Sequence, residues 1–240
     1  MRVHLLSAQI AWREDCVRDG ARLALDAAHA VPDDPEALCV VTNVLLETGE
    51  SAAARACLDR AALAGCADPL LLMRCAALRK RLEQRTEALA LLNQAKALGH
   101  DTAALRFQRG ECLMFNGRIE EAEAELAASL AGAPARGRVA VPLVRLRRQT
   151  PERNYLAAIE TGARVAVPNS VDQAAFEFAR YKALEDLGRD DEAWQALARG
   201  NALMDARMHD EIAQHDTWLD RFLAVCPSAI ARARQGVLHR

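Results

Sequence analysis

Aromatic side chains are scarce in this sequence. Phenylalanine, tryptophan and tyrosine make up 4% of its 240 residues, whereas hydrophobic residues as a whole make up 51%. The apolar content is therefore mostly alanine, leucine and valine, a composition that lets helices pack closely because large and small side chains interdigitate. A chain of this length is long enough for one large domain or for an elongated array of helices with a continuous core.

The sequence also has no surplus of one charge sign. Its formal net charge is -2, although 27% of its residues are charged. A protein that binds nucleic acid through its whole surface carries a strong basic excess, which is absent here. The composition therefore argues against nucleic acid as a partner and leaves room only for a local basic patch.

The cysteines form no recognisable motif. There are seven, and no two are separated by two residues as in zinc-binding or redox pairs. An odd number at scattered positions also argues against a secreted disulfide framework. His209 and His215 lie six residues apart, which puts them on different faces of a helix. We therefore expect no metal ion, and thiols that pack as small apolar side chains in a reducing cytoplasm.

Long apolar runs and catalytic motifs are missing as well. No window approaches the ~18 apolar residues of a membrane helix. The apolar N-terminal stretch soon meets Trp12, Arg13 and Glu14, too early for a signal peptide. The sequence has no nucleophile elbow, no phosphate-binding P-loop, no dinucleotide fingerprint and no convincing β-strand. It thus predicts a cytoplasmic protein with no membrane partner, no cofactor and no catalytic residue.

The sequence does contain a repeat of 34 residues. Small residues and leucines return at this interval, and Pro35 and Pro69 mark the starts of two units. This pattern is typical of stacked helical hairpins of the tetratricopeptide (TPR) type. It predicts an all-α fold, a right-handed α-α superhelix of TPR-like hairpins with a C-terminal capping helix, which presents an extended surface to a protein or peptide. The repeated columns are Ala54, Ala88 and Ala122; Leu58, Leu92 and Leu126; and Ala27, Ala61 and Ala95.

The pattern also predicts how the chain is divided. Glu83 stands where the neighbouring turns carry glycine, and a helix is expected to start at Thr150-Pro151-Glu152. A separate amphipathic helix from about Asp210 to Val225 is expected to cap the array. The predicted segments are 1–136, four hairpins of which the first is degenerate; 137–170, an arginine- and proline-containing break plus one helix; 171–226, a final hairpin and the capping helix; and 227–240, a disordered tail.

Repeat geometry places seven side chains on the inner groove, which the first helix of each hairpin lines. Asn43 is expected to bind a peptide backbone, and Arg74 to pair with a carboxylate or phosphate. Met73 and Phe107 are expected to hold apolar side chains of the partner. The alternative is that these two belong to the core and that Arg74 is merely solvated. The groove candidates are Trp12, Asn43, Met73, Arg74, Phe107, Gln108 and Glu111.

A cluster of arginines lies at the break in the repeat. It is compatible with binding of phosphate groups, a nucleotide or an acidic protein surface. The alternative is a solvated connector without a ligand, which is the usual role of such a run. The cluster consists of Arg136, Arg138, Arg145, Arg147, Arg148 and Arg153.

The C-terminal part of the chain carries a more specific pattern. Residues 176–203 contain "KALEDLG", "DEA" and "GN" in this order. The pattern resembles the last repeat of bacterial TPR-containing sulfotransferases, and the following helix resembles the segment before their catalytic domain. In that family the next domain opens with a strand and a loop that binds the sulfate donor. Residues 226–232 stand at that place here, and the donor-binding residues have no counterparts.

Three hypotheses follow. The first is a TPR-type scaffold that binds a protein or peptide and is not an enzyme. The second, implied by the resemblance, is the non-catalytic N-terminal part of a bacterial TPR-sulfotransferase whose donor-binding domain is missing from this chain. The third is self-association through the arginine-rich break or the terminal helix.

Overall fold

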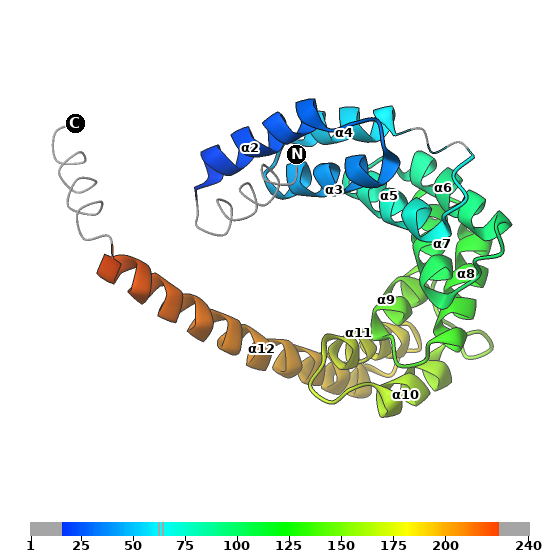
Figure 1. Cartoon of the computed structure of the whole chain (residues 1–240). Helices are drawn as coiled ribbons and strands as arrows, with labels where there is room; N and C mark the ends of the chain where they lie inside the picture. The colour runs from blue at the N-terminus through cyan, green and yellow to red at the C-terminus, as the bar shows by residue number, and fades with distance from the viewer. Residues whose placement is uncertain (1–15, 62, 64, 226–240) are drawn as a thin grey trace, which may run out of the picture. The chain divides into compact units, whose positions relative to one another are not determined.

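The computed structural model describes residues 16–61, 63 and 65–225, and the side chains of residue 17 and of residues 209–225 are outside the description. Within these ranges the chain is helical, without a strand, as Figure 1 shows. The chain divides into two compact units, Met1–Ala133 and Pro134–Arg240. The first unit contains α2 (Val17–Ala30), α3 (Pro35–Glu47), α4 (Ser51–Arg60), α5 (Pro69–Arg81), α6 (Arg85–Ala97), α7 (Ala103–Phe115) and α8 (Ile119–Gly132).

The helix starts in the first unit repeat with the sequence period. Asp34 caps α3 by accepting a 2.8 Å hydrogen bond from the backbone N–H of Ala37. Asp68 caps α5 by accepting from Leu70 and Leu71, and Thr102 caps α7 by accepting from Leu105. A side-chain oxygen at this position satisfies an N–H that has no partner inside the helix. Three caps at 34-residue intervals therefore start equivalent helices.

The repeated small and leucine columns form the core of the first unit. Ala54, Ala88 and Ala122 are fully buried, and so are the leucines four residues after each of them. Each hairpin (α3 with α4, α5 with α6, α7 with α8) packs on the next, and the first helix of the next hairpin contacts both helices of the preceding one. A methyl group at the contact lets the helices approach, and the leucine fills the space beside it.

Side-chain hydrogen bonds join two of the hairpins to the part of the chain that precedes them. Arg60 donates to the backbone carbonyls of Ala28 (3.0 Å) and Val31 (2.8 Å). One repeat later, Gln94 donates to the carbonyls of Leu63 and Cys66. Ala28 lies in the last turn of α2, where a carbonyl has no partner inside the helix. Leu63 and Cys66 lie in the segment after α4, where Leu63 also accepts from the N–H of Cys66.

The turns inside the hairpins share one backbone conformation. Gly49 and Gly117 have φ values of 83° and 73°, in the left-handed region that glycine adopts without strain. Glu83, at the equivalent position between α5 and α6, has a φ of 60°. The glutamate therefore does not change the turn that the repeat predicts, but it adopts a conformation that is unfavourable for a residue with a Cβ atom.

The second unit contains α9 (Gly137–Arg145), α10 (Leu156–Val165), α11 (Val171–Asp186) and α12 (Asp190–Val225). Helix α11 lies at its centre and packs against α9, α10 and α12. Gly137 permits a close approach, since a Cβ atom there would lie 1.9 Å from the carbonyl oxygen of Asp172. Ser170 caps α11 by accepting a hydrogen bond from the backbone N–H of Gln173.

The helix expected to start at residues 150–152 begins later. Thr150 and Arg153 exchange two backbone hydrogen bonds of 3.1 Å, and Asn154 donates to the carbonyls of Thr150 and Pro151. These bonds close a turn over the residues in question, and the Asn154 side chain then accepts from the N–H of Leu156. Helix α10 accordingly starts at Leu156. The break also holds a helix that the sequence pattern missed, α9, with Pro142 inside it.

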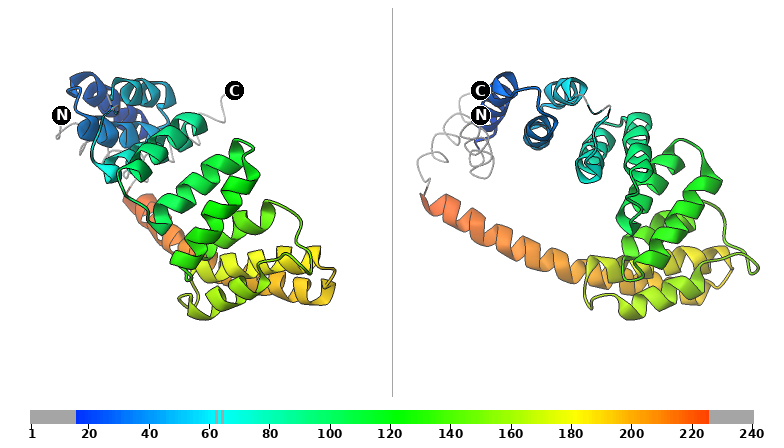
Figure 2. Two further views of the ribbon diagram at one scale, coloured as in Figure 1. Left: turned by 90° about the vertical axis from the view of Figure 1, so that its right-hand side faces the viewer. Right: turned by 45° about the vertical axis from the view of Figure 1, so that its right-hand side comes forward.

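The end of the second unit differs from the expected arrangement of two helices. The second helix of the last hairpin and the segment Asp210–Val225 form one helix of 36 residues, α12. Its first part pairs with α11, as Figures 1 and 2 show. Residues 199–208, between the hairpin and the expected cap, contain neither proline nor a glycine other than Gly200, so no strong helix breaker separates the two parts. The predicted tail, 227–240, lies outside the described residues.

Candidate functional site

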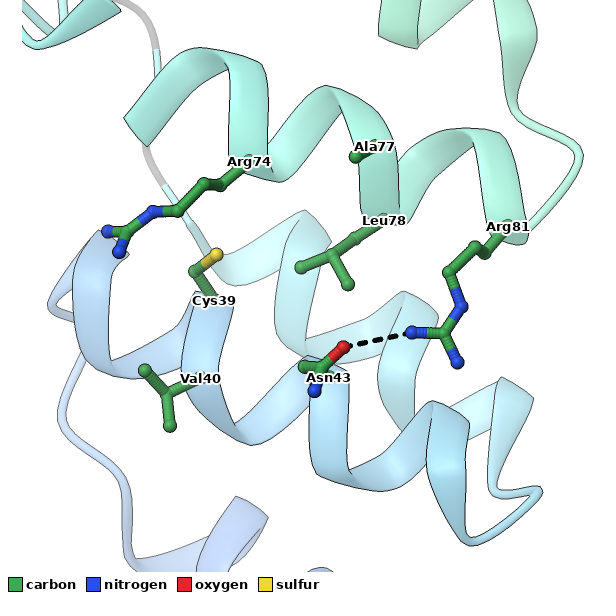
Figure 3. A pocket seen from close by; sticks show the side chains of 7 residues that line it. All are labelled: Cys39, Val40, Asn43, Arg74, Ala77, Leu78 and Arg81. Atoms are coloured by element: carbon green, nitrogen blue, oxygen red, sulfur yellow. Dashed lines mark hydrogen bonds between the residues drawn. The ribbon is translucent and has the colours of Figure 1, made fainter. Parts of the chain in front are cut away.

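A pocket of about 390 Å³ lies between α3 and α5, the first helices of two consecutive hairpins. Side chains of α5 separated by three, four and seven residues lie on one helix face and form one wall. Figure 3 shows Leu78 pointing from α5 toward α3, and Cys39 pointing from α3 toward α5 beside Arg74. The lining residues are Cys39, Val40 and Asn43 of α3 and Arg74, Ala77, Leu78 and Arg81 of α5.

Polar bonds join the two helices at both ends of the pocket. Arg74 forms an ion pair of 3.2 Å with Glu36, and Arg81 donates to the side-chain oxygen of Asn43 at 2.9 Å, the dashed line in Figure 3. Asn43 also donates to Glu47 at 2.6 Å. Each of the two bonds between the helices joins residues that are 38 apart in the sequence, which is one repeat plus about one helical turn. The pocket thus has an apolar middle, with Ala77 and Leu78, and a guanidinium at each end.

The two guanidinium groups have different partners. The pKa of Arg74 is raised, first because Glu36 accepts a hydrogen bond from it. The hydrogen bond that Arg81 donates into the pocket goes to the neutral amide of Asn43. Arg81 is exposed, and Arg74 keeps half of its side-chain surface exposed. Both side chains are therefore accessible to an acceptor from outside, and a guanidinium binds carboxylates and phosphates through paired N–H donors.

The structure brings together two of the seven groove candidates, Asn43 and Arg74, in this pocket. Met73 is 9% exposed and lies in the core, as the alternative interpretation of that residue has it. Trp12 lies outside the described residues.

The remaining three candidates lie on α7 and are partly buried. Glu111 forms an ion pair with Lys80 of α5, so its carboxylate already has a cationic partner. The side-chain oxygen of Gln108 is buried and has no hydrogen-bond partner within the described structure. Neither Phe107 nor these two residues line the α3–α5 pocket.

Sequence reasoning missed the second arginine of the pocket. Arg81 lies seven residues after Arg74, which places both on the same face of α5. Ala77 lies between them in the sequence and one 34-residue repeat after Asn43. The repeat therefore assigns this face of α5 to the same groove as Asn43. A search for residues at intervals of three, four and seven from Arg74 would have found the whole wall.

The arginines of the break do not share one environment. Arg138 lies 3.6 Å from Asp172, and Arg148 helps to lower the pKa of Asp186 through its charge. Arg147 is partly buried, whereas Arg136, Arg138, Arg145, Arg148 and Arg153 are exposed. The six arginines extend from the start of α9 to the turn before α10. None of them lines the α11–α12 pocket or the pocket beside α10.

The second unit has hollows of its own. A pocket of about 590 Å³ lies between α11 and α12, where Arg199 pairs with Glu177 at 2.9 Å. Another, of about 450 Å³, is lined by residues of the turn before α10, of α10 itself and of the α11–α12 turn. Among the residues that the structure describes, no three His, Cys, Asp or Glu side chains are grouped to hold a metal ion. In the same part of the chain no helix has the length and apolar character needed to cross a membrane.

Comparison with protein families finds no match for this sequence, and comparison with curated proteins finds none. Solved structures do resemble the fold. PilW, a widely conserved type IV pilus biogenesis factor, is 20% identical, with a TM-score of 0.57 over 84% of this chain and 92% of that chain. MamA from Desulfovibrio magneticus RS-1, residue 41 to the end, is 15% identical, with a TM-score of 0.54 over 73% of this chain and 97% of that chain.

A third similar structure names the repeat. It is a Podospora anserina protein with nearly identical TPR-like repeats, 13% identical, with a TM-score of 0.50 over 87% of this chain and 96% of that chain. At such identities the likeness shows the fold alone. It confirms the predicted all-α fold of the TPR-like solenoid class.

Proposed function

We propose that this chain is a non-catalytic scaffold that binds a protein or peptide segment in the α3–α5 pocket. One observation carries the proposal: an accessible apolar hollow lies between the first helices of two consecutive hairpins, with Arg74 at one end and Arg81 at the other. Solenoids of helical hairpins use such extended surfaces for recognition. The fold is compatible with peptide binding, and the residues of the pocket supply the apolar and polar contacts.

The pocket offers each kind of contact that an extended peptide needs. Leu78 and Ala77 provide apolar surface for one side chain of the peptide. The amide of Asn43 can bind a peptide N–H or carbonyl once its bond to Arg81 or Glu47 is exchanged. Released from Asn43, Arg81 can pair with a carboxylate, so the preferred segment has an apolar side chain next to an acidic one.

Selection from a displayed peptide library, with the purified chain as the target, tests the proposal. We expect the selected peptides to share an apolar residue beside a carboxylate. Their affinities for the Asn43→Ala and Arg81→Ala variants, measured by fluorescence polarisation, should fall by about 5-fold or more, because each variant removes a hydrogen bond worth ~1–3 kcal/mol.

Arg118→Ala is the matched control. Arg118 is also an exposed arginine of the first unit with a carboxylate partner, Glu121 at 2.7 Å, but it lies outside the pocket. Its replacement should leave peptide affinity unchanged. Selected peptides that bind the two pocket variants as tightly as the original chain would place recognition elsewhere and refute the proposal.

The sulfotransferase hypothesis stays a prediction beside this one, as do a bacterial source, a cytoplasmic location and self-association. Residues 176–203, which carry the resemblance, lie in a helical hairpin formed by α11 and the start of α12. The coding sequence beyond Arg240 provides the test. A strand followed by a Ser-Gly-Thr loop there would support the hypothesis, and a stop codon after Arg240 would exclude it.

A further inference from the structure

The two ends of the α3–α5 pocket differ in how their guanidinium groups are neutralised. Arg74 forms an ion pair of 3.2 Å with Glu36. Arg81 donates at 2.9 Å to the neutral side-chain oxygen of Asn43, whose amide N–H in turn donates to the carboxylate of Glu47 at 2.6 Å. Arg74 therefore has an anionic partner from α3, whereas Arg81 is separated from the carboxylate of Glu47 by an amide.

The ion pair between Arg74 and Glu36 lies in solvent. The two side chains keep 50% and 68% of their surface exposed. Two other cations of α5 with carboxylate partners lie deeper, Arg79 at 11% and Lys80 at 19% exposed. An exposed ion pair contributes little to stability, because water screens it and two long side chains lose freedom in forming it. The Arg74–Glu36 pair can therefore be exchanged for a pair with an incoming carboxylate at little cost to the fold.

Apolar surface lies between the two arginines. Val40 is 44% exposed and lines the pocket from α3, and Ala77 and Leu78 line it from α5. Figure 3 shows Leu78 between the two arginines. Val40 lies four residues after Glu36 and three before Asn43, so these three share one face of α3. The pocket thus offers a contact for one apolar side chain, flanked by a polar group on each side.

The spacing of the two arginines defines which segment can reach both. Arg74 and Arg81 lie seven residues apart, about 10.5 Å along the axis of α5. Figure 3 shows the Arg74 side chain extending away from Arg81, which adds to this span. In an extended peptide, neighbouring side chains on one face are two residues and about 6.7 Å apart. Side chains four residues apart, about 13.4 Å, therefore span the pocket, and the side chain midway lies over its apolar middle.

We propose that Glu36 is an internal competitor of the ligand at Arg74, and that the bound segment carries two acidic side chains, four residues apart, with an apolar side chain midway. This competition rests on the proposed peptide binding and deepens it, since it adds a second acidic residue to the segment and names the residue of the chain that limits its contribution. In the bound state one carboxylate pairs with Arg81, and the other takes the place of Glu36, whose carboxylate returns to water.

The competition makes the two ends of the segment unequal. At Arg81 an incoming carboxylate replaces a bond to a neutral amide by an ion pair. At Arg74 it forms one ion pair but displaces another, so most of the gain is cancelled. In the unaltered chain, replacing the acidic residue at the Arg81 end by its amide should therefore reduce affinity more than the same replacement at the Arg74 end.

Peptides selected against the unaltered chain test the competition. We expect them to carry acidic, apolar and acidic residues at alternate positions. Each peptide is measured by fluorescence polarisation in three forms, with both acidic residues and with either one replaced by its amide. The acidic residue whose replacement leaves Arg81→Ala without further effect is the one at the Arg81 end, and Arg74→Ala identifies the other in the same way.

Glu36→Gln removes the competing charge and keeps the size of an exposed side chain. Affinity for the doubly acidic peptides should rise by about 2- to 5-fold, the effect of one exposed ion pair. The rise should be absent for the analogue whose residue at the Arg74 end is an amide. It should also be absent when Glu36→Gln is combined with Arg74→Ala.

Glu121→Gln is the matched control. Glu121 is also paired with an exposed arginine of the first unit, Arg118, and it lies outside the pocket. Its replacement changes the net charge by the same amount and should leave all peptide affinities unchanged. A rise equal to that of Glu36→Gln would show a general effect of net charge and overturn the competition.

Other results would overturn the competition and leave the peptide site in place. These are selected peptides that depend on Asn43 and Arg81 but contain a single acidic residue, and doubly acidic peptides that bind Glu36→Gln no more tightly than the unaltered chain. Equal losses at the two ends in the unaltered chain would contradict it without any variant of Glu36. A selection that yields no peptide dependent on the pocket would refute the peptide site itself, and the competition with it.

Discussion

Asp186 shows how one side chain joins two segments of the second unit. Its carboxylate accepts from the Lys182 ammonium at 2.7 Å and from the backbone N–H of Gln149 at 3.0 Å, and its side chain is 8% exposed. Burial by itself raises the pKa of Asp186, but the two hydrogen bonds and the charges of Lys182 and Arg148 outweigh it, so the pKa is lowered. The ionised carboxylate is therefore the form that stabilises the fold.

We predict that Asp186→Asn lowers the free energy of unfolding at neutral pH by about 1–3 kcal/mol, the cost of losing a buried charge-assisted hydrogen bond. A carboxyl group whose pKa is lower when folded than when unfolded stabilises fully above its unfolded pKa, and the contribution is lost as the pH falls through the folded pKa. The difference between the variant and the original chain should therefore be full above the ordinary carboxyl pKa of about 3.9 and shrink as the pH falls below it. Urea denaturation over this pH range measures it.

Glu152→Gln supplies the control for this prediction. Glu152 is an exposed carboxylate of the same unit, and its neutralisation should change stability by less than about 0.5 kcal/mol. If Asp186→Asn destabilised the protein equally at every pH, the effect would come from packing and not from the charge.

At the pocket, the sequence predicted the residues whose role follows from their position in the 34-residue repeat. Asn43 and Arg74 were found because a 34-residue period assigns them to first helices. Met73 was placed in the groove, although it lies in the core, because a period does not determine the rotation of a helix to within one residue. Arg81 was missed because its role depends on the bond to Asn43, which joins two hairpins.

At the scale of helices and turns, Glu83 provides a direct test of the turn conformation. Its φ of 60° costs ~1–2 kcal/mol for a residue with a Cβ atom. Its ion pair with Arg85 returns little, because the Glu83 side chain is 72% exposed. We predict that Glu83→Gly raises the free energy of unfolding by up to ~1 kcal/mol, because glycine loses more entropy on folding and offsets part of the gain. Thermal and urea unfolding measure the change.

Gly117→Ala is the reciprocal experiment at the equivalent turn. No atom lies within 4 Å of the position that the new Cβ would occupy, so the effect reports on φ alone. It should destabilise the chain by about 1 kcal/mol. A stability gain from Gly117→Ala, or a loss from Glu83→Gly, would contradict the assigned turn.

The alanine columns can be tested by overpacking. Ala88 is fully buried where α6 meets its neighbours, so Ala88→Leu should lower the free energy of unfolding by about 1–3 kcal/mol. Ala90→Leu is the matched control, since it adds the same atoms to an exposed position of the same helix. An Ala88→Leu variant as stable as the Ala90→Leu variant would show that the column is not a packing contact. Thermal melts followed by circular dichroism provide the comparison.

Some helices were predictable from the sequence and others were not, for physical reasons. The helices from α3 to α8 were predictable because caps, turns and core positions all repeat every 34 residues. Helix α9 was missed because glycine and Pro142 suggested a loop, although Pro142 sits in a nine-residue helix. The start of α10 depends on the turn between Thr150 and Arg153, and the length of α12 on the absence of a helix breaker, and neither leaves a periodic signal.

At the scale of the whole chain, the structure divides between Ala133 and Pro134. The first unit has its own repeated core and contains the whole α3–α5 pocket. We therefore predict that a fragment of residues 1–133 folds alone, with a cooperative unfolding transition and with the peptide affinity of the full chain. A fragment that is unfolded by circular dichroism, at a concentration where the full chain is folded, would contradict this prediction.

The hydrogen bonds that Arg60 and Gln94 donate to the preceding part of the chain have a consequence for how the number of repeats can change. Arg60 and Gln94 occupy one position in the repeat, and each donates to backbone carbonyls near the end of the preceding repeat. An in-frame excision of residues 69–102 would join Asp68, which caps α5, directly to Ala103, the first residue of α7, so that α7 would pack where α5 packed. The shortened product should stay soluble. Excision of half that length would instead bring together helix surfaces that are not equivalent in the repeat, and we expect that product to precipitate.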